Sequence, residues 1–488
     1  MFRRLALPSL FSLAPVLLLA LFLAPSLSSA QEKGPSIESL INAHQERLSQ
    51  VALEIWDFAE VGYQEERSSA LLQQELASAG FAVEAGVAGM PTAFFAEWGS
   101  GTPVIGILAE YDALPGITQD AVPEEAPRPG ISSGHACGHH LFGAGSTGAA
   151  IATKEWLEAT GTPGTIRLYG TPAEEGGAGK VYMVREGLFE DVDIALHWHP
   201  GDNNSASSGT SLANKSAKFR FHGVSAHAAG APHRGRSALD GVEAMNHMVN
   251  LMREHVPQET RIHYVITNGG SAPNVIPNFA EVFYYVRNPE PTMVHQLFER
   301  VVDAAEGAAL GTSTTVDYEI IHGLYNLLPN ETLQKVMWKN LNAVGGVEYD
   351  ETERAYAELL YASLPEDSPP LESAAEVQPY DYVRAGMGST DVADVSWMVP
   401  TAGLRAATWV PGTPAHSWQA VSAGGMSIGT KGMLVAAKAI ALTAVELFTH
   451  PEIVEAATEE HAGLVGPDFV YTPLLGDRDP PLDYRKIR

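Results

Sequence analysis

The chain of 488 residues has a single cysteine and few basic side chains, with 30 Lys and Arg against 58 Asp and Glu. One cysteine cannot form an intramolecular disulfide, so Cys137 is either an inert thiol or a residue with a chemical role. The net charge of −28 opposes binding to a phosphate backbone, so we expect no nucleic-acid partner. Only 18% of residues are charged and 45% are hydrophobic, which is typical of a folded globular protein.

Long hydrophobic runs are also scarce, and the strongest one is residues 16–24. Two arginines precede this run, a proline flanks it on each side, and small residues follow up to Ala30. Because the run is well short of the roughly 20 residues that a membrane span requires, we expect residues 1–30 to be a secretory signal peptide. The mature protein is then expected to be periplasmic or extracellular, without a membrane span.

The first half of the chain alternates between helical and strand patterns. Apolar residues recur at helical intervals over residues 36–60. Two short apolar runs, 104–109 and 165–169, end in polar clusters and flank a further helical stretch. This alternation predicts an α/β domain with polar groups at the ends of its strands.

The pattern changes at about Lys215, and elements of both kinds follow at closer spacing. We expect strands and helices in the order strand 217–222, helix from Ser237, strand 282–286 and helix 292–309. The sequence therefore predicts an α+β insert at residues 215–322, inside a domain formed by 31–214 and 323–450. Residues 451–488 are expected to be a C-terminal extension with one short helix near Ile453 to His461.

A short motif at residues 134–140 combines one thiol with three imidazoles between glycines. Cys137 and His139 lie two residues apart, and sulfur and imidazole ligands at this spacing suit a divalent transition metal. The alternative is an inert thiol next to surface histidines.

Further candidate ligands occur in three later motifs. Glu174 and Glu175 follow a predicted strand, where one carboxylate could bind metal and the other could transfer protons. His197 and His199 share the segment 197–200, and His416 lies near the C-terminal end of the domain. Each motif alone is more often structural.

Together these motifs resemble the amidohydrolase branch of the two-metal metallopeptidases, which includes auxin-conjugate hydrolases, aminoacylases, glutamate carboxypeptidases and p-aminobenzoyl-glutamate hydrolase. The resemblance covers about residues 36–448. It implies a mixed-sheet α/β exopeptidase domain with an inserted lid and dimerisation domain at 215–322. The segment 388–397 looks like the p-aminobenzoyl-glutamate branch, in which Asp391 is expected to support the site. The alternative for Asp391 is a loop cap.

The resemblance also implies roles for individual residues. The expected metal ligands, for two zinc or manganese ions, are Cys137, His139, Glu175, His199 and His416. Glu174 is the expected general base. His197 remains the alternative to His199, because auxin-type relatives favour the earlier histidine. His140 and Glu110 stand where many relatives have Asp, which argues against an auxin-like substrate.

The insert is expected to complete the active site. By resemblance, His227 stabilises the oxyanion, often across a dimer interface, and Asn274 and Arg287 bind the substrate carboxylate. A guanidinium group suits the recognition of a carboxylate. The alternatives are a capped loop histidine for His227 and a surface strand end for Arg287. A homodimer formed through the lid is therefore expected.

The function that follows is an exported, metal-dependent amidohydrolase. Its expected substrates are N-acyl or N-aroyl amino acids similar to p-aminobenzoyl-glutamate, or short peptides. The alternative is a catalytically inactive binding protein for acyl-amino acids or peptides. A degenerate relative of that kind would be expected to lack the base or a ligand, whereas this chain keeps Glu174 and every candidate ligand.

Overall fold

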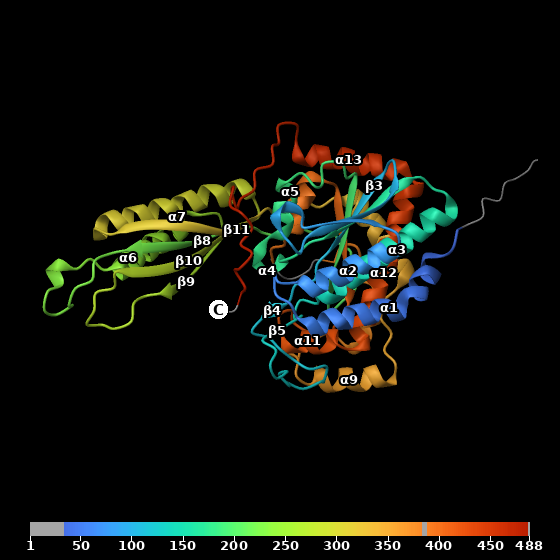
Figure 1. The fold of residues 1–488 in the computed structure, drawn as a ribbon, viewed down its shortest axis with the longest axis horizontal. Helices are drawn as coiled ribbons and strands as arrows, with labels where there is room; N and C mark the ends of the chain where they lie inside the picture. Colours follow the sequence, from blue (N-terminus) through green and yellow to red (C-terminus); the bar gives the residue numbers. More distant parts are fainter. Residues whose placement is uncertain (1–33, 383–387, 487–488) are drawn as a thin grey trace, which may run out of the picture.

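The computed structural model describes residues 34–382 and 388–486. The predicted signal peptide at residues 1–30 lies outside the described residues. Two sheets organise the described chain, a six-stranded sheet and a four-stranded sheet, and they form the two ends of an elongated molecule (Figure 1).

The six-stranded sheet is mixed. Its strands, in spatial order, are β1 (Ala82–Ala85), β2 (Phe94–Ser100), β6 (Gly164–Gly170), β3 (Val104–Ala109), β7 (Ile194–Gly201) and β12 (Thr401–Ala407). The last four strands run parallel to one another, and β2 is antiparallel to both of its neighbours. β3 is a continuous apolar run, and β6 is buried along its whole length although it carries Arg167, because parallel strands are covered on both faces. The predicted mixed-sheet α/β fold is confirmed.

Alternate residues of the strands pack into separate cores on the two faces of this sheet. On β3, Ile105 and Ile107 join the larger core, whereas Leu108 joins the second. The larger core lies under α1 (Ile37–Phe58), α3 (His139–Thr160), α8 (Glu331–Val344) and α12 (Ser427–Thr449). The second core lies under α5 (Gly179–Arg185) and α10 (Val392–Met398).

Among the described residues, α12 is long and apolar enough to cross a membrane by length and composition. The sequence-based expectation of no further segment of this kind was therefore too strict. In the structure 61% of the apolar window of α12 is buried inside the protein. It packs against α3, α8 and α1, and this packing explains its apolar composition.

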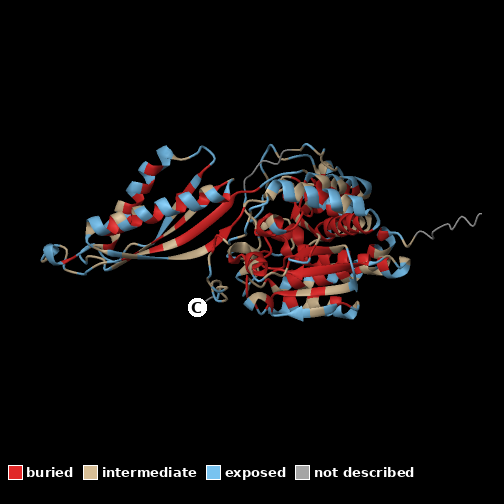
Figure 2. Cartoon of the chain, turned by 90° about the horizontal axis from the view of Figure 1, so that it is seen from above, coloured by how far each residue is buried: buried red, intermediate tan, exposed pale blue. Residues whose placement is uncertain are grey.

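The four-stranded sheet and its two helices form a lid domain, residues 213–324. The strands, in spatial order, are β11 (Thr315–Leu324), β8 (Ala213–His222), β10 (Phe279–Asn288) and β9 (Arg261–Asn268). All of its strand pairs are antiparallel, and α6 (Ala238–Met252) and α7 (Pro291–Thr312) share one core with the sheet. Figure 2 shows exposed residues along the outer sides of these helices.

The insert contains two strands that the sequence analysis missed, β9 and β11. Most residues of β9 are exposed, and its alternation is interrupted where Val265 and Ile266 stand side by side. In β11, Val316, Tyr318 and Ile320 alternate with polar residues, so this strand carried a signal that the sequence analysis did not use. The predicted strand 217–222, helix from Ser237, strand 282–286 and helix 292–309 correspond to β8, α6, β10 and α7.

The remaining elements are shorter or lie at the edges. They are α2 (Glu66–Ser78), β4 (Leu114–Pro115), β5 (Ser133–Gly134), α4 (Glu174–Gly177), α9 (Glu351–Tyr361), α11 (Trp418–Gly424) and α13 (Pro451–Val465). α13 contains the short helix predicted near residues 453–461 and extends it. After α13 the chain returns toward the gap between the two sheets, where its C-terminus is marked in Figure 1.

Candidate metal centre

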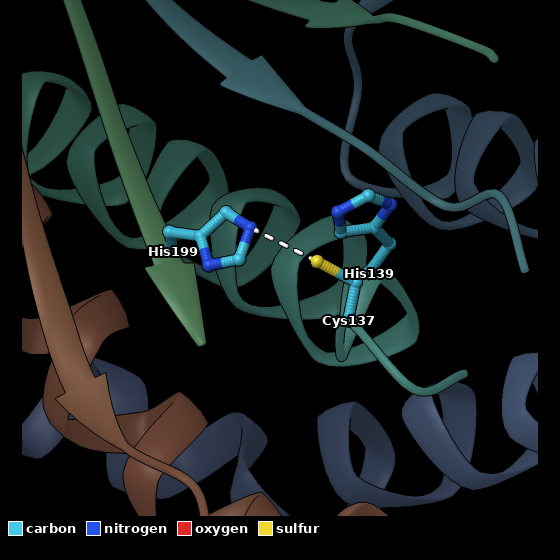
Figure 3. Close-up of side chains that lie close together, drawn as sticks. All are labelled: Cys137, His139 and His199. Atoms are coloured by element: carbon cyan, nitrogen blue, oxygen red, sulfur yellow. Dashed lines mark hydrogen bonds between the residues drawn. The ribbon is translucent and has the colours of Figure 1, made fainter. Parts of the chain in front are cut away.

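The motif residues converge at the carboxyl ends of the parallel strands. Cys137, His139 and His199 offer ligand atoms that lie within 4.8 Å of one another, and Cys137 also forms such a group with Glu175 and His416. Figure 3 shows the first group, with Sγ of Cys137 facing Nε2 of His199 at 3.4 Å. Because Cys137 belongs to both groups, the two candidate metal sites are adjacent.

The turn before α3 places the first two ligands. Cys137 ends the turn, Gly138 adopts φ 79°, and His139 opens the helix. A Cβ at Gly138 would lie 2.6 Å from Cβ of Pro200, so only glycine fits between this turn and β7. The glycine therefore brings the helix start against the end of the strand that carries His199.

The two adjacent glutamates reach different partners because the chain between them is irregular. Glu175 has φ −70° and ψ 67°, and Ala173 and Ala178 on either side adopt left-handed φ values of 58° and 59°. Oε1 of Glu175 lies 3.1 Å from Nε2 of His416. Glu174 instead forms a group with His139 and Glu110. The predicted division between one ligand and one free carboxylate is compatible with this geometry.

Asp112 contacts two of the candidate ligand residues, His139 and Glu175. Its Oδ1 accepts a hydrogen bond from Nδ1 of His139 at 2.8 Å, and its Oδ2 accepts one from the amide of Glu175 at 2.9 Å. With Nδ1 occupied, Nε2 of His139 lies 3.1 Å from Oε2 of Glu110 without a hydrogen bond in the described part of the chain, and it can serve as a metal ligand. Burial alone would raise the pKa of Asp112, but the charge and hydrogen bond of His139 outweigh it and lower that pKa.

A buried ionic group lies next to the cluster. Nζ of Lys180 donates to Oε1 of Glu110 and to Oδ1 of Asp391, each at 2.7 Å. All three side chains are almost completely buried, where an unpaired charge would be costly. Asp391 is thus linked to Glu110 through Lys180, and its supporting role in the site stays a prediction.

The electrostatics of the site favour a bound cation. Burial, followed by the carboxylates of Glu110 and Glu175, raises the pKa of Glu174 well above its ordinary value. Hydrogen bonds to Cys137 and Glu175 raise the pKa of His416 to about 10. The hydrogen-bonding neighbours of His416 thus favour its protonated imidazole. The donor set of thiolate, imidazole and carboxylate fits a divalent transition metal, which would replace that proton.

Three histidines of the motifs lie outside these groups. His197 shares its strand with His199 but packs against Gly403, and burial, Lys180 and Arg405 lower its pKa to about 3. Among the described residues it belongs to none of the three potential ligand groups. Nε2 of His135 hydrogen-bonds to the carbonyl of Ile55, and Nε2 of His140 to that of Gly424, each at 3.0 Å.

The lid residues lie at two opposite ends of their sheet. His227 is exposed in the loop after β8 and pairs through its backbone with Val275. The backbone carbonyl of Asn274 accepts a hydrogen bond from the amide of Ala228. Arg287 lies near the other end of β10, opposite Arg261. A ten-residue strand spans about 30 Å, so one chain cannot bring Asn274 and Arg287 onto one small carboxylate.

Arg287 faces a cavity of about 490 Å³ at the base of the lid. The lining residues are Leu212, Gln258, Glu259, Arg261, His263 and Arg287. Nε of Arg287 is buried and has no hydrogen-bond partner in the described parts of the chain. Burial and the neighbouring arginines lower the pKa of His263, so the two arginines carry the positive charge of this cavity. Two arginines against one acid make the cavity suitable for an anionic group.

Sequence reasoning left several supporting residues without a role. Glu110 and Asp112 carried a usable signal, because both follow a buried strand at the edge where active-site residues collect. Lys180 had no distinctive sequence context. Tyr484 and Arg485, whose side chains donate hydrogen bonds to the carbonyl of Glu175, lie more than 300 residues away along the chain.

Comparison with known proteins agrees with this architecture. Residues 213–312 match the peptidase dimerisation domain. One of the subunits of the p-aminobenzoyl-glutamate hydrolase of Escherichia coli is 42% identical over 467 residues, which cover 90% of this chain and 96% of the relative. The Xaa-Arg dipeptidase of Mus musculus is 31% identical over 432 residues, which cover 85% and 89%.

Two solved structures share the fold. An aminobenzoyl-glutamate utilization protein from Klebsiella pneumoniae superposes with a TM-score of 0.60 at 17% identity, over 84% of this chain and 98% of that one. A dinuclear metal-binding peptidase of the M20 family from Bacillus subtilis superposes with a TM-score of 0.57 at 17% identity, over 84% and 99%. At this level of identity the structures establish the fold alone.

The fold and these relatives define an enzyme of the amidohydrolase and metallopeptidase class. The chain belongs to the M20 peptidase family, in the branch that contains p-aminobenzoyl-glutamate hydrolase. The resemblance seen in the motifs is thereby confirmed.

Proposed function

We propose that the protein is an exported two-metal amidohydrolase that cleaves an amide bond next to a free carboxylate. The observation that carries this proposal is the position of Cys137 in two adjacent ligand groups, with Glu174 beside them and outside both. An inactive binding protein would have no need for a half-buried carboxylate in this position.

The proposed metal ligands are Cys137, His139, Glu175, His199 and His416. Two divalent ions bound there would polarise the amide carbonyl and lower the pKa of the attacking water. Thiolate ligation favours zinc, and the carboxylate and imidazole ligands are also compatible with manganese.

Glu174 is the proposed general base. Its carboxylate would take a proton from the attacking water and return it to the nitrogen of the departing amine. Asp112 holds the amide of Glu175, the residue after Glu174. In the group of Glu110, His139 and Glu174, Lys180 neutralises Glu110, whereas Glu174 has no salt bridge to a lysine among the described residues. Divalent ions bound nearby would lower the pKa of Glu174.

The lid residues are proposed to act between two copies of the chain. His227 and Asn274 lie at the far end of the lid, so they would reach the metal centre of a second copy, where His227 would stabilise the oxyanion. The edge strand β9 leaves Val265 and Ile266 exposed at 56% and 40%, which suits pairing with a second lid. Arg287 would bind the substrate carboxylate.

The substrate class follows from the names of the relatives. One is named for p-aminobenzoyl-glutamate and another for dipeptides that end in arginine. Both substrates place the scissile amide next to a free carboxylate. We expect N-acyl or N-aroyl amino acids, or short peptides with this group, to be hydrolysed.

Release of free amine tests the reaction. The purified protein, stripped with a chelator and reloaded with zinc or manganese, would be incubated with p-aminobenzoyl-glutamate, N-acetyl amino acids and Xaa-Arg dipeptides. We expect hydrolysis of at least one class, dependent on metal. Specific binding of these compounds without turnover, in protein shown to contain both metals, would favour the inactive binding protein instead.

Export and oligomeric state need their own measurements. Cell fractionation with N-terminal sequencing should find a chain that begins after Ala30 outside the cytoplasm.

Light scattering should find a homodimer, and the double substitution Val265→Lys and Ile266→Lys should yield monomers. Because the relative from Escherichia coli is named as one subunit of its hydrolase, dimers formed only with a different chain are the contrary outcome.

A further inference from the structure

The chain after α13 returns to the metal centre. This C-terminal segment, residues 466–486, is drawn in red in Figure 1, where it passes between the lid sheet and the helices α4 and α5. It has neither a helix nor a strand of its own. Its course is nevertheless defined by specific contacts at both domains.

The middle of the C-terminal segment is held by the lid and by the core. The guanidinium of Arg478 donates hydrogen bonds to the carbonyls of Ile320 and Ile321 on β11, the latter at 2.8 Å. Tyr471 donates to Oδ1 of Asp394 at 2.7 Å. Leu475 is only 1% exposed and belongs to the core next to α5. These contacts fix where the last residues can reach.

The end of the segment contacts the loop that carries the two glutamates. Oη of Tyr484 and Nη2 of Arg485 both donate to the carbonyl oxygen of Glu175, at 2.9 Å and 2.8 Å. The ring of Tyr484 packs edge-on against Tyr63 with 5.6 Å between the ring centres. Tyr63 itself donates to the carbonyl of Gly177 at 2.8 Å. The segment thus adds two donors to one peptide group.

This loop needs external support because its backbone is strained. The left-handed conformations of Ala173 and Ala178 are unfavourable for residues with a Cβ, and such conformations persist only where the surroundings fix them. Asp112 holds the amide of Glu175, and the C-terminal segment holds its carbonyl. The backbone of Glu175 is therefore fixed from both sides.

We infer that Tyr484 and Arg485 are positioning residues of the active site. By holding the carbonyl of Glu175 they fix the side chain of Glu175 as a metal ligand and that of Glu174 as the base. The inference rests on the proposed function and deepens it, because it assigns part of the active site to a segment whose sequence shows no motif.

Metal affinity and steady-state kinetics of matched variants test the inference. Tyr484→Phe removes one hydroxyl and keeps the ring on Tyr63, and Arg485→Ala removes the second donor. Arg485→Lys keeps a single donor and should restore part of the loss. Lys486→Ala removes an equal charge from an exposed neighbour, and it serves as the control.

The double variant, which combines Tyr484→Phe and Arg485→Ala, should bind metal 10-fold to 100-fold more weakly in competition with a chelator. A loss of this size is typical when the hydrogen-bond partners of metal ligands are removed. Its kcat should fall with little change in KM. Metal affinity and kcat within twofold of the Lys486→Ala control would overturn the inference. So would a raised KM with unchanged kcat and metal affinity, which would assign Arg485 to substrate binding.

Two further outcomes separate this inference from a folding defect and from a failure of the proposed function. If the double variant fails to fold, Tyr484→Phe alone should still weaken metal binding, because it removes a single hydroxyl. If the wild-type protein hydrolyses none of the compounds in the panel, the proposed function fails, whereas the comparison of metal affinities still decides the role of the C-terminal segment.

Discussion

The carboxyl edge of the main sheet and the far end of the lid hold their polar residues in opposite ways. At the main sheet, Cys137, His139 and Asp112 are buried and make contacts with one another or with the neighbouring strand ends. At the lid tip, His227 is exposed, and its Nδ1 accepts hydrogen bonds only from amides of its own loop among the described residues. The candidate ligands of the first region come together within one chain, whereas the imidazole of the second region is exposed.

In the proposed function, metal binding and proton transfer therefore belong to the single chain. Recognition of the oxyanion is proposed to need a pair of chains. Substitutions in the two regions should therefore differ in kind as well as in size, and the following variants separate them.

Cys137→Ala should have the largest effect, because this sulfur belongs to both ligand groups. Removing a shared ligand should release metal and abolish turnover together. Metal content by atomic spectroscopy and amine release would be measured on the same sample. A fully active variant with its normal metal content would show that Cys137 is an inert thiol.

Glu174→Gln should lower turnover by about 10² to 10⁴, the usual cost of a lost general base, while metal content stays near that of the wild type. The amide keeps the size of the side chain and removes only its ability to accept a proton. Stopped-time assays at saturating substrate would measure the fall in kcat. Turnover at the wild-type rate would exclude Glu174 as the base.

Arg287→Ala should reduce kcat/KM about a hundredfold for substrates with a free carboxylate, because a charge-assisted contact typically contributes a few kcal/mol. The matching amide substrates should be poor already and should lose little more. Arg220→Ala is the control, since this arginine lies in the same sheet and is paired with Glu281. Equal hydrolysis of acid and amide forms by the wild type would contradict this assignment.

Glu65→Gln should have the smallest effect, on stability and its pH dependence. Burial and the charge of Asp112 raise the pKa of Glu65 to about 8, against about 4.3 in an unfolded chain. Between these values the folded protein binds more protons than the unfolded one, so stability falls as pH rises toward 8. The Tm of the variant should therefore fall a few degrees less between pH 5 and pH 8.

The exposed Glu84→Gln serves as a control for that comparison. An identical pH dependence of Tm in wild type and Glu65→Gln would show that Glu65 is ionised throughout this range.

The parts of the site that the sequence predicted are those that depend on local order. The ligand motif at 134–140 and the Glu174–Glu175 pair each lie at the end of a strand or the start of a helix, and apolar patterning locates such ends. The roles of Asp112 and Lys180 depend on side chains from distant strands and helices. No local pattern specifies such partners, so the sequence left these two residues without a role.

The lid shows the same limit in its secondary structure. The capped helix α6 and the alternating strand β10 were predicted because one face of each is buried. In the mostly exposed β9 the alternation of Ile262 and Tyr264 is interrupted at Val265, and this strand is the edge through which pairing with a second lid is proposed. A strand whose partner is another chain need not show the alternation that a core imposes.

The central claim is that the metal centre of one chain works with His227 of a second chain. Complementation between two inactive variants tests this claim most directly. Glu174→Gln has an intact lid, and His227→Ala has an intact metal centre, so each homodimer should be nearly inactive. When the two chains are co-expressed, half of the dimers would be mixed. Each mixed dimer would contain one complete site, which restores about a quarter of wild-type activity. Co-expressed protein that contains mixed dimers and shows no more activity than either variant alone would contradict this account, because His227 would then act within its own chain.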